Sequence, residues 1–144
     1  MIAIDTNVLL RHLLDDDRAQ SRKAHTLIQN EGAVLITDVV LVETIWTLKG
    51  KNYNAAEDDI IAVINSLLAE PNIIFEDRQV IWAALNDYRT AKMVKPAGKN
   101  KAADFADALI VRKSHFIADQ SGQALASFYT FDRAALELID ARKP

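Results

Sequence analysis

The chain has 144 residues, of which 50% are hydrophobic and 26% are charged, with a formal net charge of -3 and no cysteine. This length and composition predict a single folded domain over residues 1–144 and exclude an intrinsically disordered chain. The lack of cysteine excludes disulfides and thiolate metal sites, and the net charge excludes only a protein that holds nucleic acid by bulk positive charge.

The apolar runs of the sequence indicate whether the chain has a signal peptide or a membrane span. The first residues lack the basic segment of a signal peptide, and Asp5 interrupts the apolar stretch. No apolar run approaches the length of a membrane span. We therefore expect a soluble, cytoplasmic protein that has no membrane partner.

Short apolar runs alternate with amphipathic segments along the whole chain. In chain order we expect a strand over 2–4, helices over 7–14 and 17–30, a strand over 33–37, helices over 38–48 and 54–69, a strand over 72–76, helices over 78–93 and 104–119, a strand over 124–129, and a short helix that begins at 132–135.

Local signals set the ends of these elements. Thr6 or Asn7 is the expected cap of the first helix, and Thr37 or Asp38 caps the helix after the second strand. The alternation predicts an α/β fold, a three-layer α/β/α arrangement with a central parallel sheet of four to five short strands. In such sheets, ligands bind beyond the carboxyl ends of the strands, where Asp5 is expected.

Several carboxylates follow an apolar strand or lie in the next helix. Asp5 follows the first strand and Asp132 the fourth, Glu43 lies in the helix after the second, and Asp104 and Asp107 share one helical face. Two like charges about 5 Å apart repel by roughly 3 kcal/mol at an effective dielectric near 20. A hard divalent cation such as Mg²⁺ removes that penalty, and the absence of histidine near these acids argues against zinc.

Each acid also has an ordinary structural explanation. Asp5, Asp104 and Asp132 can each cap a helix, and Glu43 can be a solvated helix residue. Asp107, which has alanine, leucine and isoleucine around it, is the hardest to explain without a ligand. The metal-site hypothesis therefore depends on the set of acids and not on any one of them.

Four strings carry a resemblance to a known family. IDTNVLL, TDVVLVE, DFADALI and TFDR occur in this order and resemble a PIN domain, and closely the VapC-type toxins of bacterial type II toxin–antitoxin pairs. The resemblance implies a metal-dependent ribonuclease with a central parallel sheet. By motif it assigns the catalytic acids Asp5, Glu43, Asp107 and Asp132, with Asp104 as an extra acid and no further ligand after Arg133.

The resemblance also implies roles for these residues. Mg²⁺ or Mn²⁺ would be held mainly by Asp5 and Asp107, with Asp104 as an additional possible ligand. Glu43 and Asp132 would bind a second ion or the waters of the first, and one of them would orient the attacking water. The expected products carry a 5′-phosphate and a 3′-hydroxyl.

RNA needs cations and hydrogen-bond donors around this acidic site. Thr6 and Asn7 are candidates to hydrogen-bond Asp5 or a phosphate, and Thr130 to orient Asp132, although helix capping explains all three equally well. We expect a phosphate-binding rim from basic residues near DFADALI, for which a solvated loop is the alternative. Its members are Lys92, Lys95, Lys99, Lys101, Arg112 and Lys113.

The family implies partners that the residues themselves do not identify. These are an RNA substrate such as tRNA or rRNA, a small antitoxin that neutralises the toxin, and a second copy in a homodimer. Three other readings stay open: a Mg²⁺-dependent phosphatase, which lacks its second aspartate because position 7 is Asn; a phosphoacceptor domain, which lacks a clear later lysine; and a non-catalytic PIN-like module that binds RNA or a partner.

Overall fold

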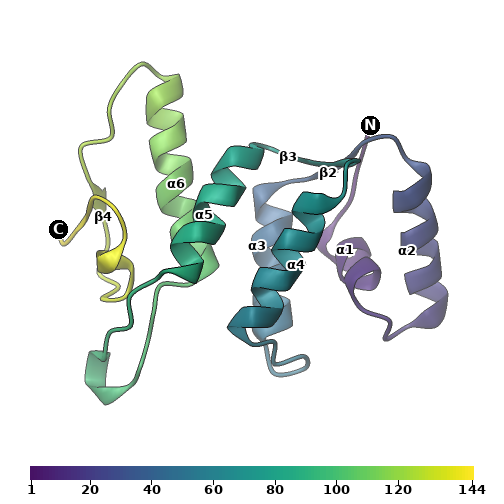
Figure 1. Ribbon diagram of the computed structural model, residues 1–144, viewed down its shortest axis with the longest axis horizontal. Helices are drawn as coiled ribbons and strands as arrows, with labels where there is room; N and C mark the ends of the chain where they lie inside the picture. The colour runs from purple at the N-terminus through teal and green to yellow at the C-terminus, as the bar shows by residue number, and fades with distance from the viewer. The chain divides into compact units, whose positions relative to one another are not determined.

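The computed structural model describes all residues from Met1 to Pro144. The chain divides into two compact units, Met1–Arg78 and Gln79–Pro144, and we describe each by itself. Figure 1 shows the helices and strands of both units. None of the helices combines the length and the apolar character that a membrane span requires.

The first unit alternates strands with helices. Its elements are β1 (Ile2–Ala3), α1 (Thr6–Leu13), α2 (Arg18–Asn30), β2 (Val34–Ile36), α3 (Asp38–Lys49), α4 (Glu57–Ala69) and β3 (Ile73–Phe75). The strands form a parallel sheet in the order β1-β2-β3. This confirms the expected fold class, an α/β protein with a parallel sheet.

The middle strand sets the register of this sheet. Val34 of β2 pairs with Ile2 on one side and with Ile73 on the other. Val34 and Ile36 are both fully buried, as expected for a central parallel strand that helices cover. Because the strands are parallel, their carboxyl ends lie at one edge of the sheet, and Asp5 and Glu76 follow β1 and β3 at that edge.

The helices of the first unit pack through fully buried aliphatic side chains. Helix α1 lies against both α2 and α3, and Leu9, Ile28 and Leu41 are the buried residues that these helices contribute. Burying a side chain of this size stabilises the folded chain by about 1.5–3 kcal/mol. The packing therefore holds in fixed positions the helix α1, which Asp5 directly precedes, and the helix α3, which carries Glu43.

The second unit contains more helix and less sheet. Its elements are α5 (Arg78–Arg89), whose first residue ends the first unit, the 3₁₀-helix η1 (Pro96–Gly98), α6 (Phe105–Gln120), β4 (Phe128–Tyr129), the 3₁₀-helix η2 (Ala135–Glu137) and β5 (Ala141–Arg142). Strands β4 and β5 pair in parallel, with Phe128 opposite Ala141. Helices α5 and α6 lie side by side (Figure 1), and the rings of Tyr88 and Phe105 meet edge to face with centroids 6.3 Å apart.

The strands differ from the expected arrangement in how they are distributed. We expected one central sheet of four to five strands, whereas three strands form one sheet and two form another. The strand expected over 124–129 contains only Phe128 and Tyr129. Strand β5 was not expected, because it has only two residues and lies in a mainly polar segment, and only its pairing with β4 makes it a strand.

Several helix ends also differ from the prediction. The cap of α1 is Asp5, not Thr6 or Asn7, since its carboxylate accepts a hydrogen bond from the Val8 amide at 2.9 Å. Helix α4 begins at Glu57 and not near 54, because Asn54 has a φ of 49°, which a helix does not allow. Helix α5 ends at Arg89, short of the expected residue 93.

Candidate active site

Asp5 lies at the exposed carboxyl end of β1. Its Oδ1 caps α1 through the Val8 amide, so the structural alternative for Asp5 is correct. A capping carboxylate still has a second oxygen, and no other contact occupies it. Asp5 is therefore a helix cap whose free oxygen is available to a ligand.

Thr6 connects the first motif to the second. Its hydroxyl donates a hydrogen bond of 2.7 Å to the Glu43 carboxylate, across 37 residues of sequence. Glu43 lies on the exposed side of α3, one turn before Thr47. The structure thus brings the IDTN and TDVVLVE motifs together, and Thr6 holds the carboxylate of Glu43 in one orientation. Asn7 is exposed and makes neither of these contacts.

Asp104 and Asp107 form a capping box at the start of α6. Asp104 Oδ1 accepts from the Asp107 amide at 2.9 Å, and Asp107 Oδ2 accepts from the Asp104 amide at 3.0 Å. The capping role that we allowed for Asp104 is therefore confirmed. Each carboxylate has one oxygen that takes no part in the capping box. The box therefore orients both acids and leaves one oxygen of each for another partner.

Asp107 is the acid with the least favourable surroundings. Burial raises the pKa of its carboxyl group, and the negative charges of Asp104 and Asp132 raise it further, while the hydrogen bond from the Asp104 backbone opposes them. Phe105, Ala106 and Ala108 beside it are buried. Asp107 is thus a half-buried carboxylate in a cluster of like charges, as the sequence indicated.

Asp132 follows β4 and divides its two oxygens between different partners. Oδ1 accepts from the amides of Ala134 and Ala135 at 2.8 and 3.2 Å, and Oδ2 forms an ion pair with the Lys101 ammonium group. This ion pair is the main cause of the lowered pKa of Asp132. The hydroxyl of Thr130 accepts from the Asp132 amide at 3.0 Å, so Thr130 orients the backbone of Asp132.

These acids have the chemistry of a hard-cation site. All are carboxylates, and Asp104, Asp107 and Asp132 interact electrostatically in the metal-free protein. Oxygen donors of this kind suit Mg²⁺ or Mn²⁺. Neither unit by itself, however, contains three or more histidine or carboxylate side chains arranged to hold a metal ion. The donor set fits the cation, and the acids are divided between the two units.

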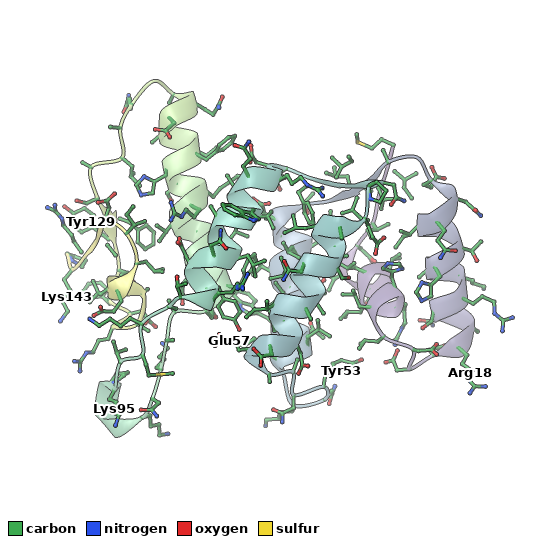
Figure 2. The ribbon with its side chains drawn as sticks, in the orientation of Figure 1. Arg18, Tyr53, Glu57, Lys95, Tyr129 and Lys143 are labelled. Atoms are coloured by element: carbon green, nitrogen blue, oxygen red, sulfur yellow. The ribbon has the colours of Figure 1, made fainter.

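The basic residues of the second unit fall into two kinds. Lys99 is exposed and forms no ion pair, and the side chain of Lys95 extends from the same loop (Figure 2). Arg112, in contrast, is held by Asp87 of α5 through two hydrogen bonds of 2.6 and 2.8 Å. This role for Arg112 was not predicted, because no local pattern in the sequence links residues 25 positions apart. Arg112 joins α5 to α6 in the folded chain.

Two aromatic side chains beside Asp132 are exposed to solvent. Tyr129, labelled in Figure 2, is 61% exposed and Phe131 is 82% exposed. Exposed rings of this kind are surfaces on which unpaired RNA bases stack. Neither ring was predicted as a binding residue, because aromatic residues in or beside an expected strand usually belong to the core.

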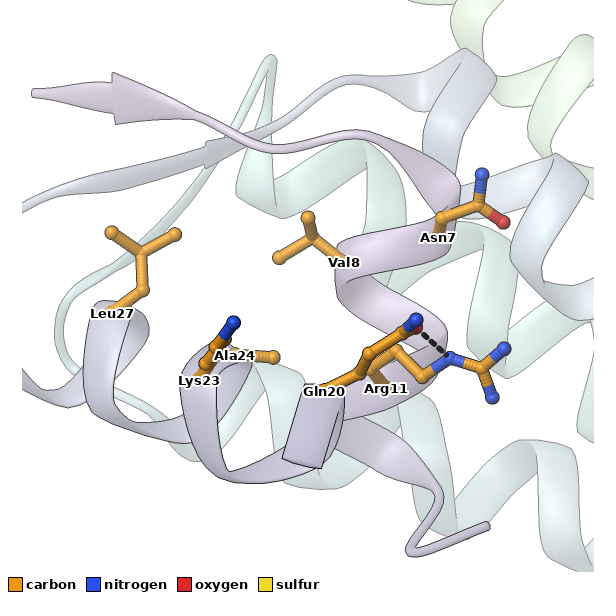
Figure 3. A pocket seen from close by; sticks show the side chains of 7 residues that line it. All are labelled: Asn7, Val8, Arg11, Gln20, Lys23, Ala24 and Leu27. Carbon is orange, nitrogen blue, oxygen red and sulfur yellow. Dashed lines mark hydrogen bonds between the residues drawn. The ribbon is translucent and has the colours of Figure 1, made fainter. Parts of the chain in front are cut away.

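The first unit also has a pocket of about 250 Å³ between α1 and α2. Figure 3 shows its lining, in which Val8, Ala24 and Leu27 are apolar and Lys23 is basic. Arg11 also lines it, but its guanidinium group is bound to Gln20 at 2.9 Å and to Asp16 at 2.6 Å. The pocket is mainly apolar with a cationic edge.

One comparison with known protein families identifies the family of this chain. The profile of the PIN domain family matches residues 2–116. The matched range includes the motifs that carry Asp5, Glu43 and Asp107, ends before Asp132, and crosses the boundary between the two units at Arg78. A comparison with curated proteins finds no match.

Proposed function

Because the chain belongs to the PIN domain family, whose members are typically metal-dependent nucleases, we propose that it is a Mg²⁺- or Mn²⁺-dependent endoribonuclease that hydrolyses phosphodiester bonds in RNA. The observation that carries this proposal is the half-buried Asp107, whose pKa is raised by burial and by the charges of Asp104 and Asp132. A divalent cation bound at this carboxylate cluster would offset the repulsion between the carboxylates and the cost of burying Asp107, and acids with perturbed pKa values are often found at functional sites.

We further propose that residues 1–144 form a single PIN domain. The family profile spans the boundary between the two units, which supports one evolutionary and functional entity. The catalytic set that we assign, Asp5, Glu43, Asp107 and Asp132, draws on both units. This assignment rests on the family motifs and not on a distance between the units.

The acids have distinct roles in the proposed reaction. Asp5 and Asp107 hold the cation, Asp104 orients Asp107 through the capping box and is an additional ligand, and Glu43 or Asp132 orients the attacking water. When bound, the divalent ion acts as a Lewis acid that acidifies water and neutralises charge on the phosphate. Thr6 fixes Glu43 for its task by donating to its carboxylate at 2.7 Å. The products carry a 5′-phosphate and a 3′-hydroxyl.

RNA binding falls to side chains around the acids. Lys99 and Lys101 contact phosphates, Asn7 and Thr130 are further polar contacts, and Phe131 stacks on an unpaired base. Arg112 is a weaker candidate than Lys99 for a phosphate contact, because Asp87 already occupies its guanidinium group. The basic loop therefore carries most of the proposed phosphate binding.

We propose a biological role as the toxin of a type II toxin–antitoxin pair in the cytoplasm, acting as a homodimer on tRNA or rRNA. The pocket between α1 and α2 suits the antitoxin, because Val8, Ala24 and Leu27 accept an apolar side chain and Lys23 attracts acidic flanking residues. A non-catalytic PIN-like module is the alternative, and the experiment below separates it from the nuclease.

The test is cleavage of total tRNA and rRNA by the full chain with Mg²⁺ or Mn²⁺, with and without a chelator. Asp5→Asn and Asp107→Asn are the site variants, and Asp58→Asn, on the exposed first turn of α4, is the matched control. We expect the chelator and both site variants to stop cleavage and the control to cut normally. Cleavage that persists under the chelator and in both site variants would exclude the proposed metal site.

A further inference from the structure

A lysine side chain reaches into the acidic cluster of the second unit. The Lys101 ammonium group forms an ion pair with Oδ2 of Asp132. The pKa of Lys101 is raised first by this hydrogen bond and, after the charge of Asp132, by the negative charges of Asp107 and Asp104. One cation thus interacts with three carboxylates, each of which is assigned as a metal ligand or a water-orienting group.

The backbone of Lys101 is held in place in the loop before α6. Val94 and Lys101 form an antiparallel bridge with two hydrogen bonds, from the Val94 amide at 2.7 Å and from the Lys101 amide at 2.8 Å. Asp104, the cap of α6, follows three residues later. The bridge therefore directs the Lys101 side chain at the acids, while its flexible four-carbon stem lets the ammonium group move.

The carboxylate of Asp132 has only one oxygen that is not occupied by backbone amides. The amides of Ala134 and Ala135 occupy Oδ1, so Oδ2 is the oxygen that remains for a positive charge. In the structure the Lys101 ammonium group forms its ion pair with that oxygen. A divalent ion and Lys101 cannot both bind closely at the same oxygen, because two cations in contact repel.

We propose that Lys101 is the internal counter-ion of the acidic cluster, and that a divalent cation must displace its ammonium group from Asp132, so that Lys101 sets the apparent metal affinity. This inference rests on the proposed function, since it takes the acids to be a metal site. The side chain of Lys101 is 49% exposed, so it has a path to leave the cluster. Once released, its ammonium group faces solvent beside the acids, where an RNA phosphate offers it a new partner.

The experiment measures binding of Mn²⁺ alone to the full chain, without RNA, by isothermal titration calorimetry and by thermal unfolding. The variant is Lys101→Met, which keeps the apolar stem and removes the charge. The matched control is Lys92→Met, since Lys92 lies in the same loop region and pairs with Glu137 at 2.9 Å. Asp107→Asn locates the bound ion, because its loss of Mn²⁺ binding assigns the signal to this cluster.

We expect Lys101→Met to bind Mn²⁺ about three- to tenfold more tightly than the native chain, because the ion no longer displaces a bound cation. Its melting temperature without metal falls, and the rise that Mn²⁺ produces becomes larger. Lys92→Met changes the affinity less than twofold. In RNA cleavage, Lys101→Met needs less Mn²⁺ for half-maximal rate but has a higher KM for RNA.

Two results overturn the inference, and they differ in what they say about the proposed function. Equal Mn²⁺ affinity in the native chain and Lys101→Met, with binding lost in Asp107→Asn, removes the counter-ion role and leaves the metal site intact. Absence of Mn²⁺ binding in every form overturns both proposals. If Lys101→Met binds Mn²⁺ more tightly but the native chain cuts no RNA, the counter-ion role is supported and the proposed nuclease activity is contradicted.

Discussion

The acids of the two units differ in their surroundings. In the first unit Asp5 and Glu43 are exposed, and their carboxylates accept single hydrogen bonds from the Val8 amide and the Thr6 hydroxyl. In the second unit Asp104, Asp107 and Asp132 are partly buried and interact with one another and with Lys101. The first pair of acids is positioned by helix geometry and by the Thr6 hydroxyl, whereas in the second set burial and neighbouring charges disfavour the ionised form of Asp107.

This difference separates an acid that stabilises the fold as a helix cap from an acid whose burial is unfavourable. A carboxylate that caps an exposed helix stabilises the chain by about 0.5–2 kcal/mol, so Asp5 has a structural reason to exist without a ligand. For Asp107, burial and then the negative charges of Asp104 and Asp132 raise the pKa and so disfavour the ionised carboxylate. The second unit is therefore where removal of a charge should stabilise the metal-free protein, and where a cation should stabilise it most.

The largest expected effect is on catalysis, and it should be the same in both units. Asp5→Asn keeps the helix cap and Asp107→Asn keeps the capping-box acceptor, so each removes charge with little change in backbone structure. We expect each to lower the rate of RNA cleavage by about a hundredfold or more. Single-turnover kinetics with Mg²⁺ measure it. A loss in Asp107→Asn alone would show that the first unit does not contribute to the reaction.

The two arginine–aspartate pairs give the next largest contrast. Arg112 and Asp87 are 31% and 19% exposed, and Arg112→Ala leaves Asp87 without its partner, at a cost of about 2 kcal/mol, or roughly 6 °C in melting temperature. Arg11→Ala breaks a pair whose aspartate, Asp16, is 37% exposed and so stays better solvated without its partner, and the melting temperature should change by about 1 °C or less. Thermal unfolding in low and high salt checks both.

A different outcome would support the original prediction that Arg112 contacts an RNA phosphate. If Arg112→Ala unfolds at the same temperature as the native chain but has a raised KM for RNA, its guanidinium group serves the substrate and not the contact between α5 and α6.

The Thr6–Glu43 hydrogen bond should have a smaller effect, confined to catalysis. Thr6→Val removes the hydroxyl that donates to Glu43 at 2.7 Å, and we expect the cleavage rate to fall roughly three- to tenfold. Thr47→Val is the matched control, because the Thr47 hydroxyl donates at 2.8 Å to the Glu43 backbone carbonyl and not to its carboxylate. Equal losses in both variants would mean that helix α3 and not the carboxylate is affected.

The smallest effect concerns stability and pH. Burial raises the pKa of Asp107, so the folded chain binds this proton more tightly than the unfolded chain does, and stability is lost as the pH rises through the folded value. Asp107→Asn removes this loss and should raise the metal-free melting temperature at pH 7 by about 1–2 °C, with no gain at pH values below the unfolded pKa. Asp5→Asn should show no such rise. A lower melting temperature in Asp107→Asn at pH 7 would mean that the ionised carboxylate stabilises the metal-free chain.

The sequence by itself determined the local structure and the nature of the candidate ligands. Thr37 was one of the two residues predicted to cap its helix, and capping was one of the alternatives given for Asp104, because a capping side chain bonds an amide only three residues away. The alternation of apolar runs and amphipathic helices predicted the parallel sheet. This signal is also local, because it depends on the periodicity of apolar residues within each segment.

Tertiary structure decided which charged groups meet. Thr6 with Glu43, Arg112 with Asp87 and Lys101 with Asp132 are separated by 37, 25 and 31 residues. Strand β5 likewise exists only because β4 lies beside it. No periodic pattern encodes such pairs, because each depends on how whole helices and loops pack and on whether a charge is buried or exposed after they do.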